Sequence, residues 1–90
     1  MFPSFLDNAK VLYHTPAGNY GTVCLTTGKI EDYITFLAIC RYPSGSSYFL
    51  FGCNAEYEVV SDMPFDDIPA CMNAARLSLQ KNIPWIAAEH

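Results

Sequence analysis

Two neighbouring segments that are apolar on both faces constrain the fold of this chain more than any other feature. Residues 32–42 (DYITFLAICRY) and 48–53 (YFLFGC) have the β-branched and aromatic character of strands. The turn residues between them, PSGSS, are typical of a hairpin. Because successive side chains of a strand point to opposite faces, Phe49 and Leu50 face opposite ways. Both faces of this hairpin therefore need an apolar cover.

Three further strands are predicted around this hairpin, over residues 9–15, 20–27 and 56–62. Each has β-branched or aromatic residues and is bounded by Gly, Pro or Asn turn signals. The connections are too short for the crossovers that parallel strands need, so we expect an antiparallel sheet.

One helix is predicted after the strands, over about residues 66–82. Asp66 is the candidate N-cap, Pro69 falls in the first turn, Asn82 is the expected C′ residue, and Pro84 prevents continuation. A stripe of apolar residues recurs at helical spacing and is expected to face the sheet: Ile68, Cys71, Met72, Ala75 and Leu79.

Together these elements predict a single α+β domain over residues 1–90. It consists of an antiparallel four- to five-stranded meander sheet with one main C-terminal helix packed on one face. Five strands about 4.8 Å apart make a sheet roughly 20 Å wide, and a helix about 10 Å across covers half of one face. The second face therefore needs another cover.

Two interpretations of this missing cover stay open. In the first, the sheet curls into a half-barrel filled by its own aromatic residues, helped by an N-terminal arm with Phe2 and Phe5 and by the tail with Trp85. In the second, the face or its edge binds another polypeptide, and we expect a second copy in a homodimer, with an unlike protein as the alternative. The second interpretation predicts partner contacts from aromatic and apolar side chains, including Leu77 on the outer side of the helix: Tyr33, Tyr48, Tyr57, Leu77 and Trp85.

The charges and apolar runs of the chain limit its partners. The formal net charge is −4, and the five Lys and Arg residues are scattered along the sequence. Nucleic-acid binding needs clustered positive charge, so we expect no nucleic-acid partner. A negative charge favours a basic partner. The longest apolar runs are far shorter than the roughly 20 residues of a membrane span, and the opening MFPSFLDNAK lacks a secretory signal. We therefore expect a cytoplasmic protein that does not bind membranes.

The titratable residues match no catalytic or metal-binding pattern, so no catalytic residue, metal or cofactor is predicted. The four cysteines, Cys24, Cys40, Cys53 and Cys71, include no C-x-x-C pair and are interpreted as buried residues with reduced thiols. One alternative stays open, in which His14 approaches one of these cysteines and forms the site of a small enzyme or ligand-binding domain.

The segment YFLFGCNAEYEVVSDMPFDDIPACMNAA reads as a strand, a tight turn, a second strand and a helix with acidic residues at its start, and a tryptophan follows in IPW. Over about residues 48–85 this arrangement resembles the small immunity proteins of bacterial polymorphic-toxin systems. The resemblance implies an acidic, non-catalytic inhibitor of a basic toxin or effector. The predicted function is therefore a non-enzymatic protein-binding domain. A structural accessory protein of a phage or mobile element is a further alternative.

Overall fold

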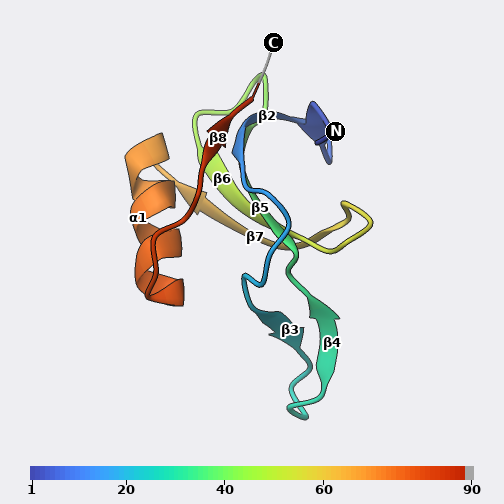
Figure 1. Ribbon diagram of the computed structural model, residues 1–90. Helices are drawn as coiled ribbons and strands as arrows, with labels where there is room; N and C mark the ends of the chain where they lie inside the picture. The colour runs from blue at the N-terminus through green and yellow to red at the C-terminus, as the bar shows by residue number, and fades with distance from the viewer. Residues whose placement is uncertain (89–90) are drawn as a thin grey trace.

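The body of the molecule is a curled antiparallel sheet with one helix against it (Figure 1). The computed structural model describes residues 1–88. The strands of its main sheet are, in spatial order, β1 (Phe5–Leu6), β2 (Ala9–His14), β5 (Phe36–Arg41), β6 (Tyr48–Cys53) and β7 (Val59–Phe65), and β8 (Ile86–Ala87) also pairs with β2. The helix α1 (Ile68–Leu79) packs against β6 and β7, and a separate hairpin joins β3 (Thr22–Cys24) to β4 (Ile30–Tyr33). The predicted α+β class, with an antiparallel sheet and a C-terminal helix, is confirmed.

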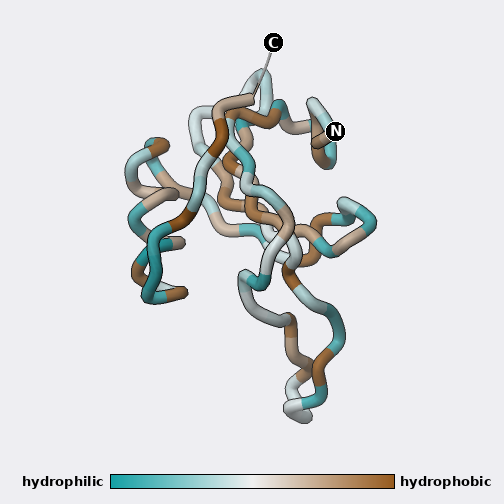
Figure 2. The backbone as a smooth tube through the Cα atoms, viewed as in Figure 1, coloured by the Kyte–Doolittle hydropathy of each residue, from teal (hydrophilic) through white to brown (hydrophobic). Residues whose placement is uncertain are grey.

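The β5–β6 hairpin lies at the centre of the sheet, and both of its faces are apolar as predicted. Ala38 pairs with Phe51, and Ile39 pairs with Leu50, so alternate pairs point to opposite faces. The second face, which points away from α1, contributes to a buried cluster shared with β1 and β2: Leu6, Ala9, Val11, Phe36, Ala38, Cys40, Phe51 and Cys53. Figure 2 shows hydrophobic residues along these central strands.

The curl of the sheet lets the chain cover its own second face. Phe2 stacks on His14 with the ring centroids 4.3 Å apart, and its ring meets Phe36 at 5.6 Å. Tyr57 in turn stacks on Phe36 at 4.7 Å. On this face the first interpretation therefore applies, because the N-terminal arm and the β6–β7 turn supply the missing cover. Phe5 does not help as predicted, since its side chain is exposed on β1.

The helix α1 covers the opposite face of the sheet through the predicted stripe. Cys71 and Ala75 of this stripe are buried, and Ala75 packs with Leu37 of β5 and Tyr20. Trp85 packs against the same cluster from the tail. One face of the sheet is thus covered by α1 and the tail. The other face is covered by the sheet's own curled edge.

Both helix ends differ from the predicted ones. Asp67 is the N-cap in place of Asp66, because its extended backbone lets its carboxylate accept a 2.8 Å hydrogen bond from the Ala70 N–H. The C-terminal end comes before Asn82, because Gln80 has a left-handed φ of 55° that stops the helix there.

The predicted strand 32–42 is in fact two strands, because its backbone changes partner in the middle. The Ile34 N–H donates to the Gly21 carbonyl at 2.9 Å, whereas the Thr35 N–H donates to the Cys53 carbonyl at 2.8 Å. The first half becomes β4, which leaves the main sheet and pairs with β3. The predicted strand over residues 20–27 shortens to β3, so the main sheet is a meander interrupted by a hairpin.

The predicted strand 56–62 begins later, as β7, because the side chain of Asn54 organises a turn before it. Its Oδ1 accepts hydrogen bonds from the N–H groups of Glu56 and Glu58 at 3.0 and 2.9 Å. Tyr57 lies inside this turn with a left-handed φ of 62°, which a strand does not adopt. β7 then runs along the edge of the sheet, where a proline is tolerated.

Candidate functional site

The five predicted contact residues are not brought together on one surface. Tyr57 is half-buried against Phe36, and Tyr48 lies at the start of β6 with the Arg41 guanidinium 5.1 Å from its ring centroid. Tyr33, on β4, and Leu77, on the outer side of α1, are 61% and 59% exposed. The predicted exposure of Leu77 is therefore confirmed. Trp85 is half-buried in the tail. These positions point to two separate surfaces, one on the β3–β4 hairpin and one between α1 and the tail.

The first surface is one face of the β3–β4 hairpin, which extends away from the body (Figure 1). Thr22 pairs with Tyr33, and Cys24 pairs with Ile30. Because cross-strand partners point to the same side, these four residues form one face, which we call the hairpin face. Between the two pairs the register shifts by a bulge at Glu31, and this bulge keeps Ile30 and Tyr33 on the same side.

The hairpin face is open to solvent. Ile30 is 45% exposed, and Leu25 beside it in the turn is equally exposed. The turn itself is well formed, since the Leu25 N–H donates to the Lys29 carbonyl and the Gly28 N–H donates to the Leu25 carbonyl, each at 2.8 Å. Gly28 has a φ of 87°, which only glycine adopts readily. Figure 2 shows hydrophobic residues on this projecting hairpin as well as in the body.

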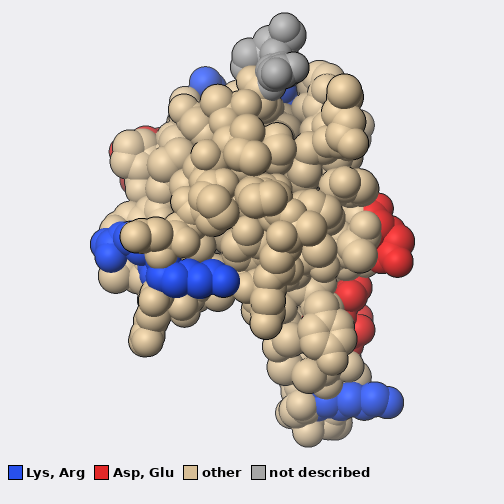
Figure 3. All heavy atoms as spheres, viewed as in Figure 1, with Lys and Arg blue, Asp and Glu red and all other residues tan. Residues whose placement is uncertain are grey.

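The opposite face of the hairpin is tied to the body through acidic residues. The buried Asn54 side chain donates from Nδ2 to Asp32 Oδ2 at 3.0 Å and to Glu58 Oε1 at 2.9 Å. The hydrogen bond from Asn54, and a second one from the Tyr33 N–H, lower the pKa of Asp32 from its usual value. Both carboxylates therefore lie close together around Asn54, on the side of the hairpin opposite the hairpin face. Figure 3 shows acidic atoms gathered on this side of the molecule.

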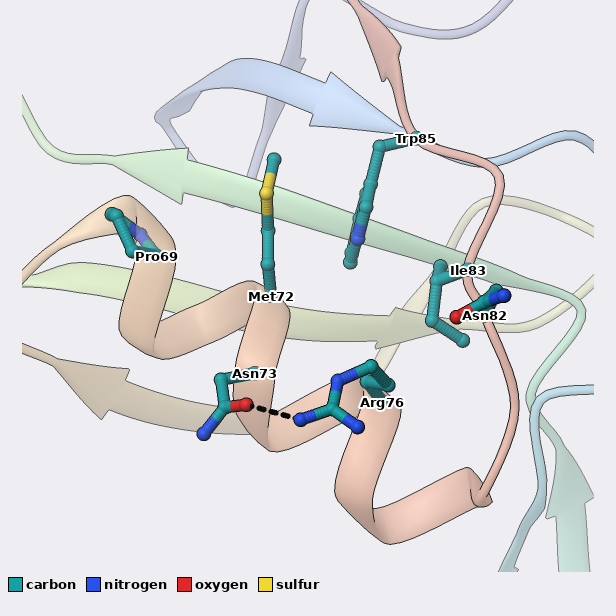
Figure 4. Close-up of a pocket in the computed structure, with 7 residues that line it drawn as sticks. All are labelled: Pro69, Met72, Asn73, Arg76, Asn82, Ile83 and Trp85. Atoms are coloured by element: carbon teal, nitrogen blue, oxygen red, sulfur yellow. Dashed lines mark hydrogen bonds between the residues drawn. The ribbon is translucent and has the colours of Figure 1, made fainter.

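The second surface is a recess of about 500 Å³ between α1 and the tail, which we call the α1–tail pocket (Figure 4). It is lined by Pro69, Met72, Asn73, Arg76, Asn82, Ile83 and Trp85. In Figure 4, Met72 extends from the helix and Trp85 extends from the tail into the recess. Arg76 lies one turn after Met72, and its Nη2 donates to Asn73 Oδ1 at 2.8 Å.

Trp85 lines this pocket because the tail folds back onto the sheet. The Ala88 N–H donates to the Leu12 carbonyl at 2.9 Å, and β8 pairs with the end of β2. Sequence reasoning placed Trp85 among the contact residues but missed Arg76. The sequence signal that could have identified Arg76 is its position one helical turn after Met72, which belongs to the predicted stripe.

In the part of the chain that the structure describes, no hydrogen bond joins His14 to a cysteine, the pair on which the enzyme alternative depends. The His14 ring stacks on Phe2, and its Nδ1 lies 3.3 Å from the Thr15 carbonyl oxygen. Desolvation by burial, with a smaller contribution from nearby charges, raises the pKa of the Cys40 and Cys53 thiols to about 12. The same cause raises the pKa of Cys71 to about 11. Such thiols are protonated and poor nucleophiles at neutral pH.

Within residues 1–88, no group of three or more His, Cys, Asp or Glu side chains is arranged to hold a metal ion. The one helix described there lacks the length and apolarity that crossing a bilayer requires.

Comparison with protein-family models, with curated proteins and with solved structures found no match to this chain. The two surfaces themselves are therefore the basis for inferring a function.

Proposed function

We propose that this chain is a non-enzymatic protein-binding domain that holds an unlike, basic protein against the hairpin face. The observation that carries the proposal is the exposure of Tyr33, Ile30 and Leu25 on a hairpin that stands apart from the main sheet. An isolated two-stranded hairpin is marginally stable, and apolar side chains on it contribute nothing to the core. Contiguous exposed apolar groups of this kind are typical of an interaction surface.

Acidic residues on the other side of the same hairpin support a basic partner. Asp32 and Glu58 share one amide donor, so a Lys or Arg from a partner meets two carboxylates at once. Because the pKa of Asp32 is lowered, its carboxylate stays charged at neutral pH. Tyr33 follows Asp32 directly and offers a ring on which a guanidinium can stack.

An inhibitor of a basic toxin or effector is the kind of binding domain that we propose. Inhibition by binding needs apolar contact area and complementary charge but no catalytic group. The hairpin combines these two features, with apolar side chains on the hairpin face and carboxylates on its other side. The net charge of −4 adds long-range attraction for a basic partner.

Site-specific photocrosslinking tests this proposal. A benzophenone amino acid replaces Tyr33 in the chain expressed in its native cells, and the adducts are identified by mass spectrometry. We expect an adduct with an unlike, basic protein. The matched control places the same group at Met63, which is 57% exposed on β7 in the main sheet, and should give none.

Two results would contradict the proposal. The absence of an adduct from position 33, or equal adducts from positions 33 and 63, would remove the hairpin face as the contact surface. An adduct with a second copy of the chain alone would replace the unlike partner by a homodimer.

A further inference from the structure

We propose that the α1–tail pocket binds a carboxylate joined to an aromatic or branched aliphatic group. This site goes beyond the proposed protein contact, because it is lined by α1 and the tail and shares no residue with the hairpin face. The carboxylate can belong to a small organic acid or to the C-terminal residue of a peptide, and the two sources share the same chemistry.

The apolar half of the pocket is formed by Met72, Ile83 and Trp85. The Trp85 ring is held in place because it also packs against the cluster of Tyr20, Leu37 and Ala75. Met72 is a flexible side chain that adapts to an irregular partner. The recess is open on one side, and its volume of about 500 Å³ accommodates a phenyl or branched aliphatic group.

The polar half of the pocket is formed by Arg76 with Asn73 and Asn82. A guanidinium has five N–H donors, and one of those of Arg76 is used by the neutral Asn73 Oδ1. Its positive charge is therefore not neutralised by this partner. A carboxylate accepts two parallel hydrogen bonds from a guanidinium, which is the pairing that arginine favours.

Two basic side chains lie near the C-terminal end of α1 in an otherwise acidic chain. Lys81 and Arg76 line an adjoining recess at the end of α1, whereas Asp32 and Glu58 lie beside the hairpin. Figure 3 shows basic atoms over the helix, and acidic atoms both beside the hairpin and farther up on the helix side. Arg76 also interacts favourably with the negative end of the α1 dipole, but that role needs only a positive charge.

Trp85 is the only tryptophan in the chain, so its fluorescence reports directly on the pocket. The probes are 3-phenylpropionate and a short peptide that ends in phenylalanine. Each is compared with the uncharged amide of the same carboxyl group. We expect each acid to change the fluorescence saturably and each amide to bind at least about tenfold more weakly, because the charge-assisted hydrogen bonds are lost. Tighter binding of the peptide acid assigns the site to chain termini, and equal binding assigns it to free acids.

Substitutions separate the pocket from general electrostatics. Arg76→Gln and Arg76→Lys should each weaken binding of the acid about tenfold or more, because neither retains the bidentate geometry. Lys10→Gln removes an equal charge from the exposed surface of β2 and should leave the affinity within about twofold. The hairpin variant Ile30→Ser/Tyr33→Ser should not change the affinity for the acid. The proposed pocket and the proposed protein contact can therefore be disproved separately.

Three results would overturn the inference. They are equal binding of acid and amide, unchanged affinity in Arg76→Gln, and no saturable response to either acid. Full affinity in Arg76→Lys would also count against it, because a general positive charge would then suffice. Arg76 is exposed, so its variants should fold, and urea unfolding of each variant verifies this.

Discussion

Gly52 shows how closely a single position in the sheet is determined by its neighbours. It lies on β6 opposite Ser61 of β7, on the face that α1 covers. A Cβ atom added there would overlap Ser61 Oγ and lie 3.0 Å from Ile34 Cδ1. Any side chain at this position therefore pushes β7 or Ile34 away from β6.

We expect Gly52→Ala to lower the free energy of unfolding by about 1–3 kcal/mol, as overpacking in a core does. Urea unfolding measures the change. Gly45→Ala is the matched control, because its added Cβ would lie at an ordinary 3.5 Å from Tyr42 Cβ, and it should be nearly neutral. Adding Ser61→Gly to Gly52→Ala should recover part of the loss. Equal effects at positions 45 and 52 would contradict the packing described for β6 and β7.

The buried thiols of Cys40, Cys53 and Cys71 make stability depend on alkaline pH. Their pKa values in the folded chain are raised to between about 11 and about 12, from an ordinary value near 9. Above pH 9 the unfolded chain loses these protons while the folded chain keeps them. The free energy of unfolding is therefore fully retained below about pH 9 and falls as the pH rises above it.

Urea unfolding under reducing conditions, at about pH 8 and about pH 10, checks this expectation. Cys24→Ser is the control, because Cys24 is exposed and its removal should leave the fall unchanged. A thiol reagent at neutral pH should label Cys24 alone in the folded chain. Rapid labelling of a second cysteine, or stability that does not fall with rising pH, would show that these thiols are not buried as described.

At the scale of elements, α1 and the β5–β6 hairpin followed from local signals. Pro69 and the apolar stripe predicted the helix, and PSGSS between two apolar runs predicted the hairpin. The N-cap was misplaced by one residue, because two aspartates stand side by side and only backbone geometry selects Asp67. The division between β4 and β5 was not predictable, since it depends on hydrogen bonds to the distant Gly21 and Cys53.

The choice of N-cap can be measured. Asp67→Ala should lower the free energy of unfolding by about 1 kcal/mol, because the Ala70 N–H loses its side-chain acceptor. Asp66→Ala should change it by less than about 0.5 kcal/mol, as a surface substitution does. The reverse order of effects in urea unfolding would restore Asp66 as the cap.

At the scale of the whole molecule, the surplus of apolar surface predicted from the sequence is resolved in two ways. On the second face of the sheet it is covered by Phe2, which the sequence offered as part of an N-terminal arm, and by Tyr57. No local pattern indicates the role of Tyr57, because it enters from a left-handed turn. Elsewhere it remains exposed, above all on the hairpin. Tyr33 was selected from the sequence, but Ile30 was not, since the bulge that aligns the two residues becomes visible only in the paired strands.

The central claim is that the hairpin face binds a protein, and the affinity for the partner identified by crosslinking tests it most directly. Isothermal titration compares the wild type with Ile30→Ser/Tyr33→Ser and with the control Leu77→Ser, which changes an equally exposed apolar residue on α1. We predict that the hairpin variant binds at least about tenfold more weakly, because it loses the exposed apolar contacts. The control should bind as the wild type does, and both variants should keep the free energy of unfolding within about 0.5 kcal/mol. Unchanged affinity in the hairpin variant, or an equal loss in the control, would contradict the claim.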